Sequence, residues 1–239
     1  MRATVSRVVD PFLTEADRVL GTGYSAILYG SAARDDFVPG RSDINLMLVL
    51  EELSPGILRS LSRAFTGWRK SSREPPLILS RSEWARATDA FPIEITDMRH
   101  SYQVLRGSDP LQGLSVDQTD LRKALEREFR GKLLRLRQGY ATHAPDPGAL
   151  GSLGLESAAT ILVLLRGMLT LLGKAVPATP TELASAAAEA AGFEAEHLLY
   201  VVRHRSDREW RCGAPEFENY MYAVEQAARF LDQLQLGDQ

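Results

Sequence analysis

The spacing of apolar residues changes near residue 115 and divides the chain into two parts. In the first part, short apolar runs predict buried strands at 26–29, 43–50 and 77–79. Apolar residues three and four apart predict helices at 5–20, 55–69 and 80–88. After residue 116 only the helical spacing remains, and it predicts helices over 117–140, 150–172, 180–191, 194–204 and 215–236. The fold class predicted is α+β, with an α/β domain at 1–114 and an all-α helical bundle domain at 115–239.

The stretch from residue 24 to 50 reads YSAILYGSAARDDFVPGRSDINLMLVL and holds the clearest chemical signal. Gly30 ends an apolar run, and a glycine lets an anion approach the backbone closely. A short helix predicted from Ser31 would point its first N–H groups at that anion. On the next strand, Asp43 and Asn45 project from one face because side chains alternate. Two oxygen ligands facing a glycine-serine turn indicate a metal ion and a nucleotide phosphate.

Gly30-Ser31, an eleven-residue gap and Asp43-Ile44-Asn45 resemble the signature of the polymerase-beta-like nucleotidyltransferase superfamily. The segments SAAR at 31–34 and RSD at 41–43 are similar to those of its small bacterial members. The resemblance implies a mixed sheet with flanking helices and a helical C-terminal domain. It also implies transfer of a nucleoside monophosphate from a nucleoside triphosphate, ATP by preference, to a hydroxyl acceptor with Mg²⁺ or Mn²⁺. The residues it assigns to nucleotide binding are Gly30, Ser31, Arg34 and Ser42.

The same resemblance implies a third carboxylate on a strand beside the one that carries Asp43. We predict a strand over 91–98 and choose Glu94, which stands between two isoleucines. Burying a carboxylate in apolar surroundings is costly unless a cation compensates its charge. Asp97 is the alternative, and on a strand the two side chains would point to opposite faces. The expected catalytic and metal-binding set is Asp43, Asn45 and Glu94.

Asn45 departs from the superfamily pattern, which usually has a second carboxylate at this position. An amide oxygen can bind Mg²⁺ but brings no charge. The sequence therefore supports two readings: a metal-dependent nucleotidyltransferase weakened by Asn45, or a catalytically inactive module that binds a nucleotide or a protein.

Composition sets limits on the partners. The chain has 28 basic and 31 acidic residues, so net charge implies no nucleic-acid partner. Residues 116–239 hold 17 acidic and 14 basic groups, too even to indicate a cationic acceptor. Seven of those basic residues fall in the helix predicted at 117–140. They form either a solvated helix face or a contact with phosphate. Cys212 alone cannot form an internal disulfide. With no signal sequence or membrane span recognised, we expect a cytoplasmic protein; a homodimer stays open.

Overall fold

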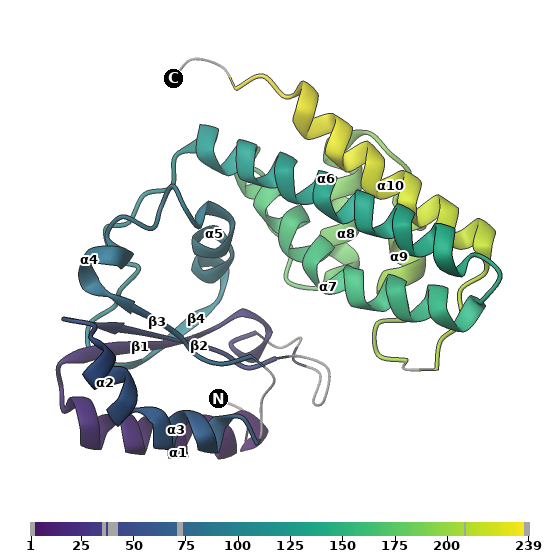
Figure 1. Cartoon of the computed structure of the whole chain (residues 1–239). Coiled ribbons are helices and arrows are strands. Elements are labelled where there is room, and N and C mark those ends of the chain that lie inside the picture. The colour runs from purple at the N-terminus through teal and green to yellow at the C-terminus, as the bar shows by residue number, and fades with distance from the viewer. Residues whose placement is uncertain (1–2, 35–36, 38–42, 71–73, 208, 237–239) are drawn as a thin grey trace. The chain divides into compact units, whose positions relative to one another are not determined.

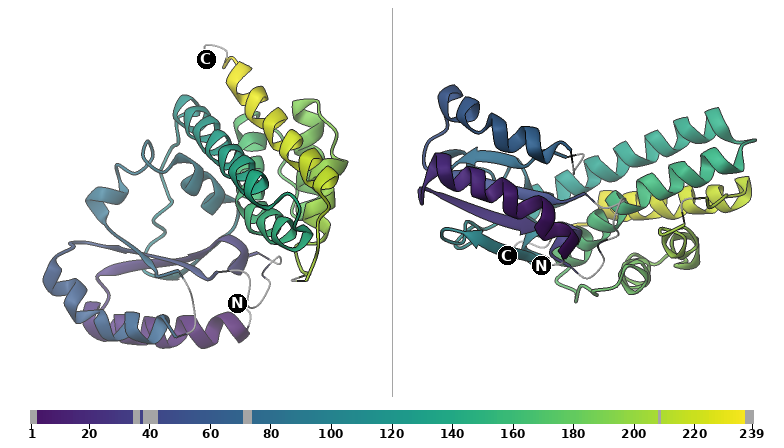
Figure 2. Two further views of the ribbon diagram at one scale, coloured as in Figure 1. Left: turned by 45° about the vertical axis from the view of Figure 1, so that its right-hand side comes forward. Right: turned by 90° about the horizontal axis from the view of Figure 1, so that it is seen from below.

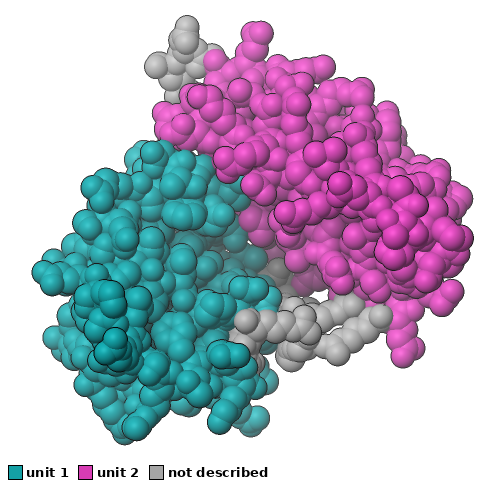
Figure 3. Space-filling model, in the orientation of Figure 1, with its two compact units in different colours: residues 1–116 teal, residues 117–239 magenta. Residues whose placement is uncertain are grey.

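A computed structural model describes residues 3–34, 37, 43–70, 74–207 and 209–236. It consists of two compact units, residues 1–116 and 117–239, which are coloured separately in Figure 3. We call them the sheet unit and the helical unit. Ser42, expected at the nucleotide site, lies outside the described residues.

The sheet unit is built on four strands in the order β3-β2-β1-β4. The central strand β1 pairs antiparallel with both β2 and β4, whereas β3 runs parallel to β2. The sheet is therefore mixed, and the predicted α+β class is confirmed. The elements in chain order are α1 (Ala3–Leu20), β1 (Tyr24–Tyr29), η1 (Gly30–Ala32), β2 (Asn45–Leu50), α2 (Pro55–Ser60), α3 (Ser62–Trp68), β3 (Leu77–Ser80), α4 (Arg81–Trp84), α5 (Pro92–His100) and β4 (Tyr102–Arg106).

Each face of this sheet is covered by its own helices, as Figure 1 shows. Helices α1 and α3 lie on one face, where Leu28 and Leu48 belong to the same apolar cluster as Phe12 and Trp68. The other face is covered by α5. Because side chains alternate, the apolar runs of β1 and β2 supply both layers. The residues that β1, β2 and α5 contribute to the second cluster are Ile27, Met47, Val49, Ile95 and Met98.

The segment 91–98, predicted to be a strand, forms helix α5 instead. Pro92 lies in the first helical turn, where its fixed φ favours initiation and its missing N–H removes no helical hydrogen bond. The prediction relied on a short apolar-acid-apolar pattern, which fits either period over so few residues. One of the two edge strands of the sheet is β4, which follows α5 and was not predicted. The single helix predicted at 55–69 is also divided, into α2 and α3.

A closed polar network holds the starting end of β1. The Tyr24 hydroxyl donates to Asp17 on α1 at 2.6 Å, and Arg106 at the end of β4 donates to both carboxylate oxygens of Asp17 at 3.0 to 3.2 Å. Gly107 continues this packing, because a Cβ there would lie 2.4 Å from the Tyr24 carbonyl oxygen. One carboxylate is thus matched by one guanidinium, and the network ties α1, β1 and β4 together.

The helical unit contains five helices within its described residues, and two views are given in Figure 2. They are α6 (Gln118–His143), α7 (Pro147–Leu171), α8 (Pro180–Ala191), α9 (Glu196–Arg203) and α10 (Ala214–Gln233). All five correspond to predicted helices. Among the described residues, α7 is the one helix long and apolar enough to cross a membrane, but it packs against α6 and α8 as the core helix of the bundle.

Several basic residues of α6 serve its packing against α10. Arg130 pairs with Asp232 at 2.7 Å and Arg137 with Glu225 at 3.1 Å. Arg122 donates to the Leu231 carbonyl oxygen at 3.0 Å. Part of the basic pattern is therefore interhelical, an explanation that the sequence reading did not include.

Candidate functional site

The glycine-serine turn follows β1 directly. Gly30 has φ +72°, a left-handed conformation that favours glycine. The backbone N–H groups of Ala33 and Arg34 donate to the Gly30 carbonyl oxygen at 3.0 and 3.2 Å. The predicted helix is therefore a single 3₁₀ turn, and no side chain caps it. Its attraction for an anion depends on backbone amides at close range, because so short a turn has little dipole of its own.

Asn45 packs directly on this turn. It opens β2 and pairs with Tyr29, the residue before Gly30. A Cβ on Gly30 would lie 2.6 Å from the Asn45 side-chain nitrogen, so a larger residue there would push this amide aside. Asn45 lies two residues before Met47, which packs on the α5 face, and alternation puts the Asn45 side chain on the same face. The antiparallel register thus brings together two motifs that are fifteen positions apart in the chain.

Asp43 precedes β2 and lies just outside the strand. Its side chain is half-buried, as is that of Asn45. Both residues therefore stand at the edge of the apolar layer, where a carboxylate keeps access to water and to a ligand. The register brings Asn45 next to the glycine turn, and Asp43 stands two residues before Asn45 in the chain.

Because this segment is helix α5 and not a strand, the Glu94 and Asp97 side chains point in different relative directions from those predicted. Residues three apart on a helix lie on the same side, so the prediction that they point to opposite faces is wrong. Glu94 is exposed in the first turn, whereas Asp97 is half-buried. Asp97 Oδ2 lies 3.6 Å from Arg34 Nη1. Asp97, the alternative carboxylate, is therefore paired with the expected phosphate-binding arginine.

The strand beside β2 is β3, and an acidic residue stands just before it. In the parallel register Met47 lies beside Leu77, and Glu74 comes three residues before this paired stretch. The charge of Glu74 raises the pKa of Tyr29, the residue that pairs with Asn45. Sequence reasoning missed it; the signal was an acid close before a short apolar run, followed directly by two prolines.

The pKa of Tyr29 is sensitive to the negative charges at this end of the sheet. Burial, which is the largest cause, and the negative charges of Glu94, Asp97 and Glu74, in that order, together raise the pKa of its phenol to about 12. A phenol resists ionisation when carboxylates surround it. The same end of β1 therefore gathers the acidic groups of α5 and of the segment before β3.

Comparison with known proteins bears on the fold. No protein-family description matches the chain, and no curated protein matches it. A solved structure does: the spectinomycin adenyltransferase AAD(9) from Enterococcus faecialis, solved with ATP and spectinomycin. The TM-score is 0.62, with 13% identity over 95% of this chain and 99% of that one. This chain shares the fold of that enzyme. At such identity the similarity shows the fold alone.

A nucleotidyltransferase site needs oxygen ligands for a divalent cation, and the residues present fit that need. Within the described residues no three histidine, cysteine or acidic side chains converge as a metal cage. Mg²⁺ is commonly held by one or two carboxylates together with substrate phosphates, not by a cage of protein ligands alone. Asp43 and the Asn45 amide are the residues that we predict to supply that smaller set.

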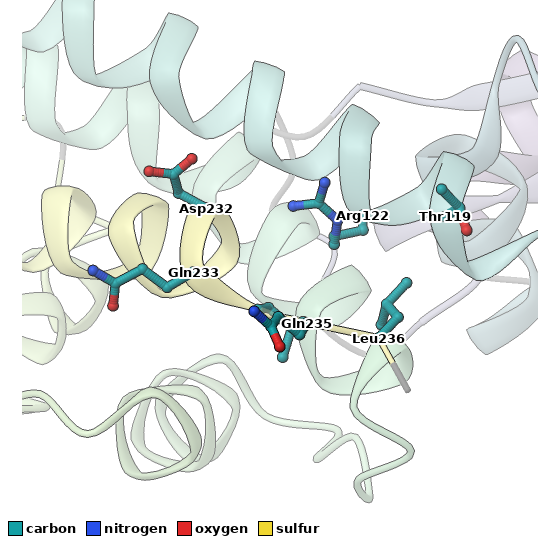
Figure 4. Close-up of a pocket in the computed structure, with 7 residues that line it drawn as sticks. Thr119, Arg122, Asp232, Gln233, Gln235 and Leu236 are labelled. Carbon is teal, nitrogen blue, oxygen red and sulfur yellow. The ribbon is translucent and has the colours of Figure 1, made fainter. Parts of the chain in front are cut away.

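A surface hollow lies in the helical unit, shown in Figure 4, and is lined by α6 and the end of the chain. Its one arginine, Arg122, already donates to Glu126 and to the Leu231 carbonyl oxygen. None of the residues expected at the nucleotidyltransferase site lines this hollow.

Proposed function

We propose that this protein transfers a nucleoside monophosphate from a nucleoside triphosphate, ATP by preference, to a hydroxyl group of an acceptor. The observation that carries the proposal is the pairing of Tyr29 with Asn45, which brings Asn45 next to the Gly30 turn. A nucleotidyltransferase fold and the similarity to an adenyltransferase support it.

The turn would hold the triphosphate. Its backbone amides and the Ser31 hydroxyl would donate to phosphate oxygens, and Arg34 would balance part of their charge. Asp43 and Asn45 would hold Mg²⁺, which, when bound, neutralises phosphate charge and polarises the phosphoryl group under attack.

In the reaction, the acceptor hydroxyl oxygen forms a bond to the α-phosphorus. The bond from that phosphorus to the bridging oxygen breaks, and pyrophosphate leaves. The hydroxyl proton passes to the third carboxylate of the site. Glu94 is the choice from the sequence for this role, and its charge acts on Tyr29 beside Asn45; Glu74, whose charge acts on Tyr29 less, is the alternative.

Labelled ATP incubated with Mg²⁺ or Mn²⁺ and a panel of hydroxyl acceptors, spectinomycin included, tests the proposal. Pyrophosphate released in proportion to a labelled acceptor product would support it. Binding is tested separately by calorimetry with Mg²⁺ and ATP on the native chain and on Ser31→Gln. A matched control is Ser62→Gln on α3, which covers the opposite face of the sheet. Equal binding by all three proteins would rule out the phosphate role of the turn.

The second candidate is a module that binds the nucleotide without turnover. Asn45 favours it, because the amide adds no negative charge to the metal-binding set. ATP binding by the native chain with no acceptor product, across the whole panel and with both metals, would establish this alternative.

A further inference from the structure

The pair between Arg34 and Asp97 is far more buried than an ordinary surface pair of the sheet unit. Their side chains are 15% and 12% exposed, whereas those of Arg81 and Glu51 are 61% and 69% exposed. Solvent-exposed pairs contribute little, but a charge pair removed from water carries a desolvation cost. A buried pair at the edge of a proposed site is therefore a candidate for a role beyond stability.

Both sides of this pair are held by backbone structure. The Arg34 N–H donates to the carbonyl oxygens of Gly30 and Ser31, each at 3.2 Å, which fixes it at the end of the turn. Asp97 lies within α5 between Thr96 and Met98, which are both buried. The carboxylate therefore belongs to a packed helix, and the arginine belongs to the turn proposed to bind phosphate.

The separation of 3.6 Å is longer than a charge-assisted hydrogen bond, which is usually about 2.7 to 2.9 Å. Attraction at this distance restricts the guanidinium without requiring a fixed bidentate contact. A guanidinium has five N–H donors, more than one carboxylate can accept, so one that is oriented from one side can still bind a phosphate oxygen.

We propose that Asp97 is a positioning residue that holds Arg34 ready for the triphosphate, which makes α5 part of the nucleotide site. This rests on the proposed function. The sequence reading treated this segment as a metal-binding strand, whereas here α5 orients the arginine. Asp97 acts through Arg34 and does not bind the cation.

The experiment measures Mg²⁺-ATP affinity by calorimetry on the full chain. Asp97→Asn removes the charge and keeps the size, and is expected to raise Kd about tenfold, the scale seen when an orienting partner is lost. Arg34→Ala should raise Kd by at least as much. The double variant should bind no more weakly than Arg34→Ala, because Asp97 acts only through that residue. Asp97→Glu, which restores the charge, should recover part of the affinity.

The matched control is Asp10→Asn, an exposed carboxylate on α1, which covers the other face of the sheet; it should bind as the native chain does. Native affinity in Asp97→Asn would overturn the proposal, as would a double variant that adds the two losses in full.

A second measurement needs no nucleotide and separates this proposal from the proposed function. Thermal unfolding of Asp97→Asn, Arg34→Ala and the double variant without ATP should show that the double variant loses less than the two single losses together. Additive losses would overturn the pairing. Failure of the native chain to bind any triphosphate would overturn the proposed function and the phosphate role of Arg34 with it, whatever the unfolding data show.

Discussion

The two ends of strand β1 each carry a tyrosine next to acidic groups, and they differ in how the charge is balanced. At the start, Tyr24 donates to Asp17, which Arg106 holds through both carboxylate oxygens. At the other end, three carboxylates act on Tyr29. Matched charges that satisfy one another stabilise a fold. A gathering of carboxylates beside a glycine turn suits a ligand that brings positive charge, as a metal-bound nucleotide does.

The largest effect should come from the carboxylate beside the turn. We expect Asp43→Asn to lower turnover by roughly 100-fold or more, the scale of losing one strong electrostatic contribution to the transition state. Stability should hardly change, because Asp43 lies outside the strand and is half-buried. Initial rates with ATP and Mg²⁺, with Asp10→Asn as the control for net charge, measure this. Unchanged turnover in Asp43→Asn would contradict the view that the Tyr29 end of β1 binds a ligand whereas the Tyr24 end is structural.

The third carboxylate gives the next effect in size. Because the charge of Glu94 acts on Tyr29 more strongly than that of Glu74, Glu94→Gln should lower turnover by about 100-fold, as expected for loss of a general base. Glu74→Gln should lower turnover less, since its charge acts least on Tyr29 of the three carboxylates. The two variants change the same chemistry at two positions and act as controls for each other. A greater loss of turnover in Glu74→Gln would show that the choice made from the sequence is wrong.

Gly30→Ala tests the close contact with Asn45. An alanine at φ +72° carries a strain of about 1 to 2 kcal/mol. Its Cβ would also displace the Asn45 amide and weaken nucleotide binding. Gly21→Ala is the matched control, because Gly21 has φ +60° with no atom within 4 Å of the added Cβ. We expect both variants to lose similar amounts of stability, and only Gly30→Ala to lose ATP binding. Equal ATP binding by both variants would show that the contact has no function.

At the start of β1, beside Tyr24, we expect Asp17→Asn to have a small effect on stability and none on ATP binding. Arg106, and then the Tyr24 hydroxyl, lower the Asp17 pKa against the opposing effect of burial. A carboxyl with a lowered folded-state pKa stabilises above its ordinary pKa, and that contribution is lost as the pH falls through the folded value. Asp17→Asn should cost roughly 0.5 to 1 kcal/mol near neutral pH, since the Arg106 and Asp17 side chains are 41% and 38% exposed and solvent screens them.

Urea unfolding of the native chain and Asp17→Asn from pH 7 down to pH 2 measures this. The difference between the two should be constant near neutral pH and should shrink in acid. A difference that grows in acid, or ATP affinity that changes in the variant, would contradict a purely structural role.

How far the sequence predicted this site depended on the range of the contacts involved. The apolar run before Gly30 and the one after Asp43 are local signals, and both strands formed, although the second begins at Asn45 and leaves the predicted strand residue Asp43 outside it. The segment 91–98 is too short for its period to decide between strand and helix, and the proline at its start was the better guide.

Pairings between distant segments were not predicted. Which strand lies beside β2 depends on the sheet topology, so Glu74 was missed and Glu94 was chosen from its neighbours in the sequence. The pairing of Arg130 with Asp232 was missed for the same reason, because its partners are 102 positions apart. Local pattern predicts elements; the register between them decides which side chains meet.

The most direct test of the account is Mn²⁺ titration, with ATP present, of the native chain and Asn45→Asp. An amide brings no charge to the site, and two divalent ions a few ångströms apart repel each other strongly, so the native chain should hold one cation tightly. The added carboxylate should raise Mn²⁺ affinity and allow a second cation, and should raise turnover. Asn219→Asp on the exposed side of α10 controls for net charge. If Asn45→Asp binds Mn²⁺ no better than the native chain, Asn45 is not at a metal site and the account is wrong.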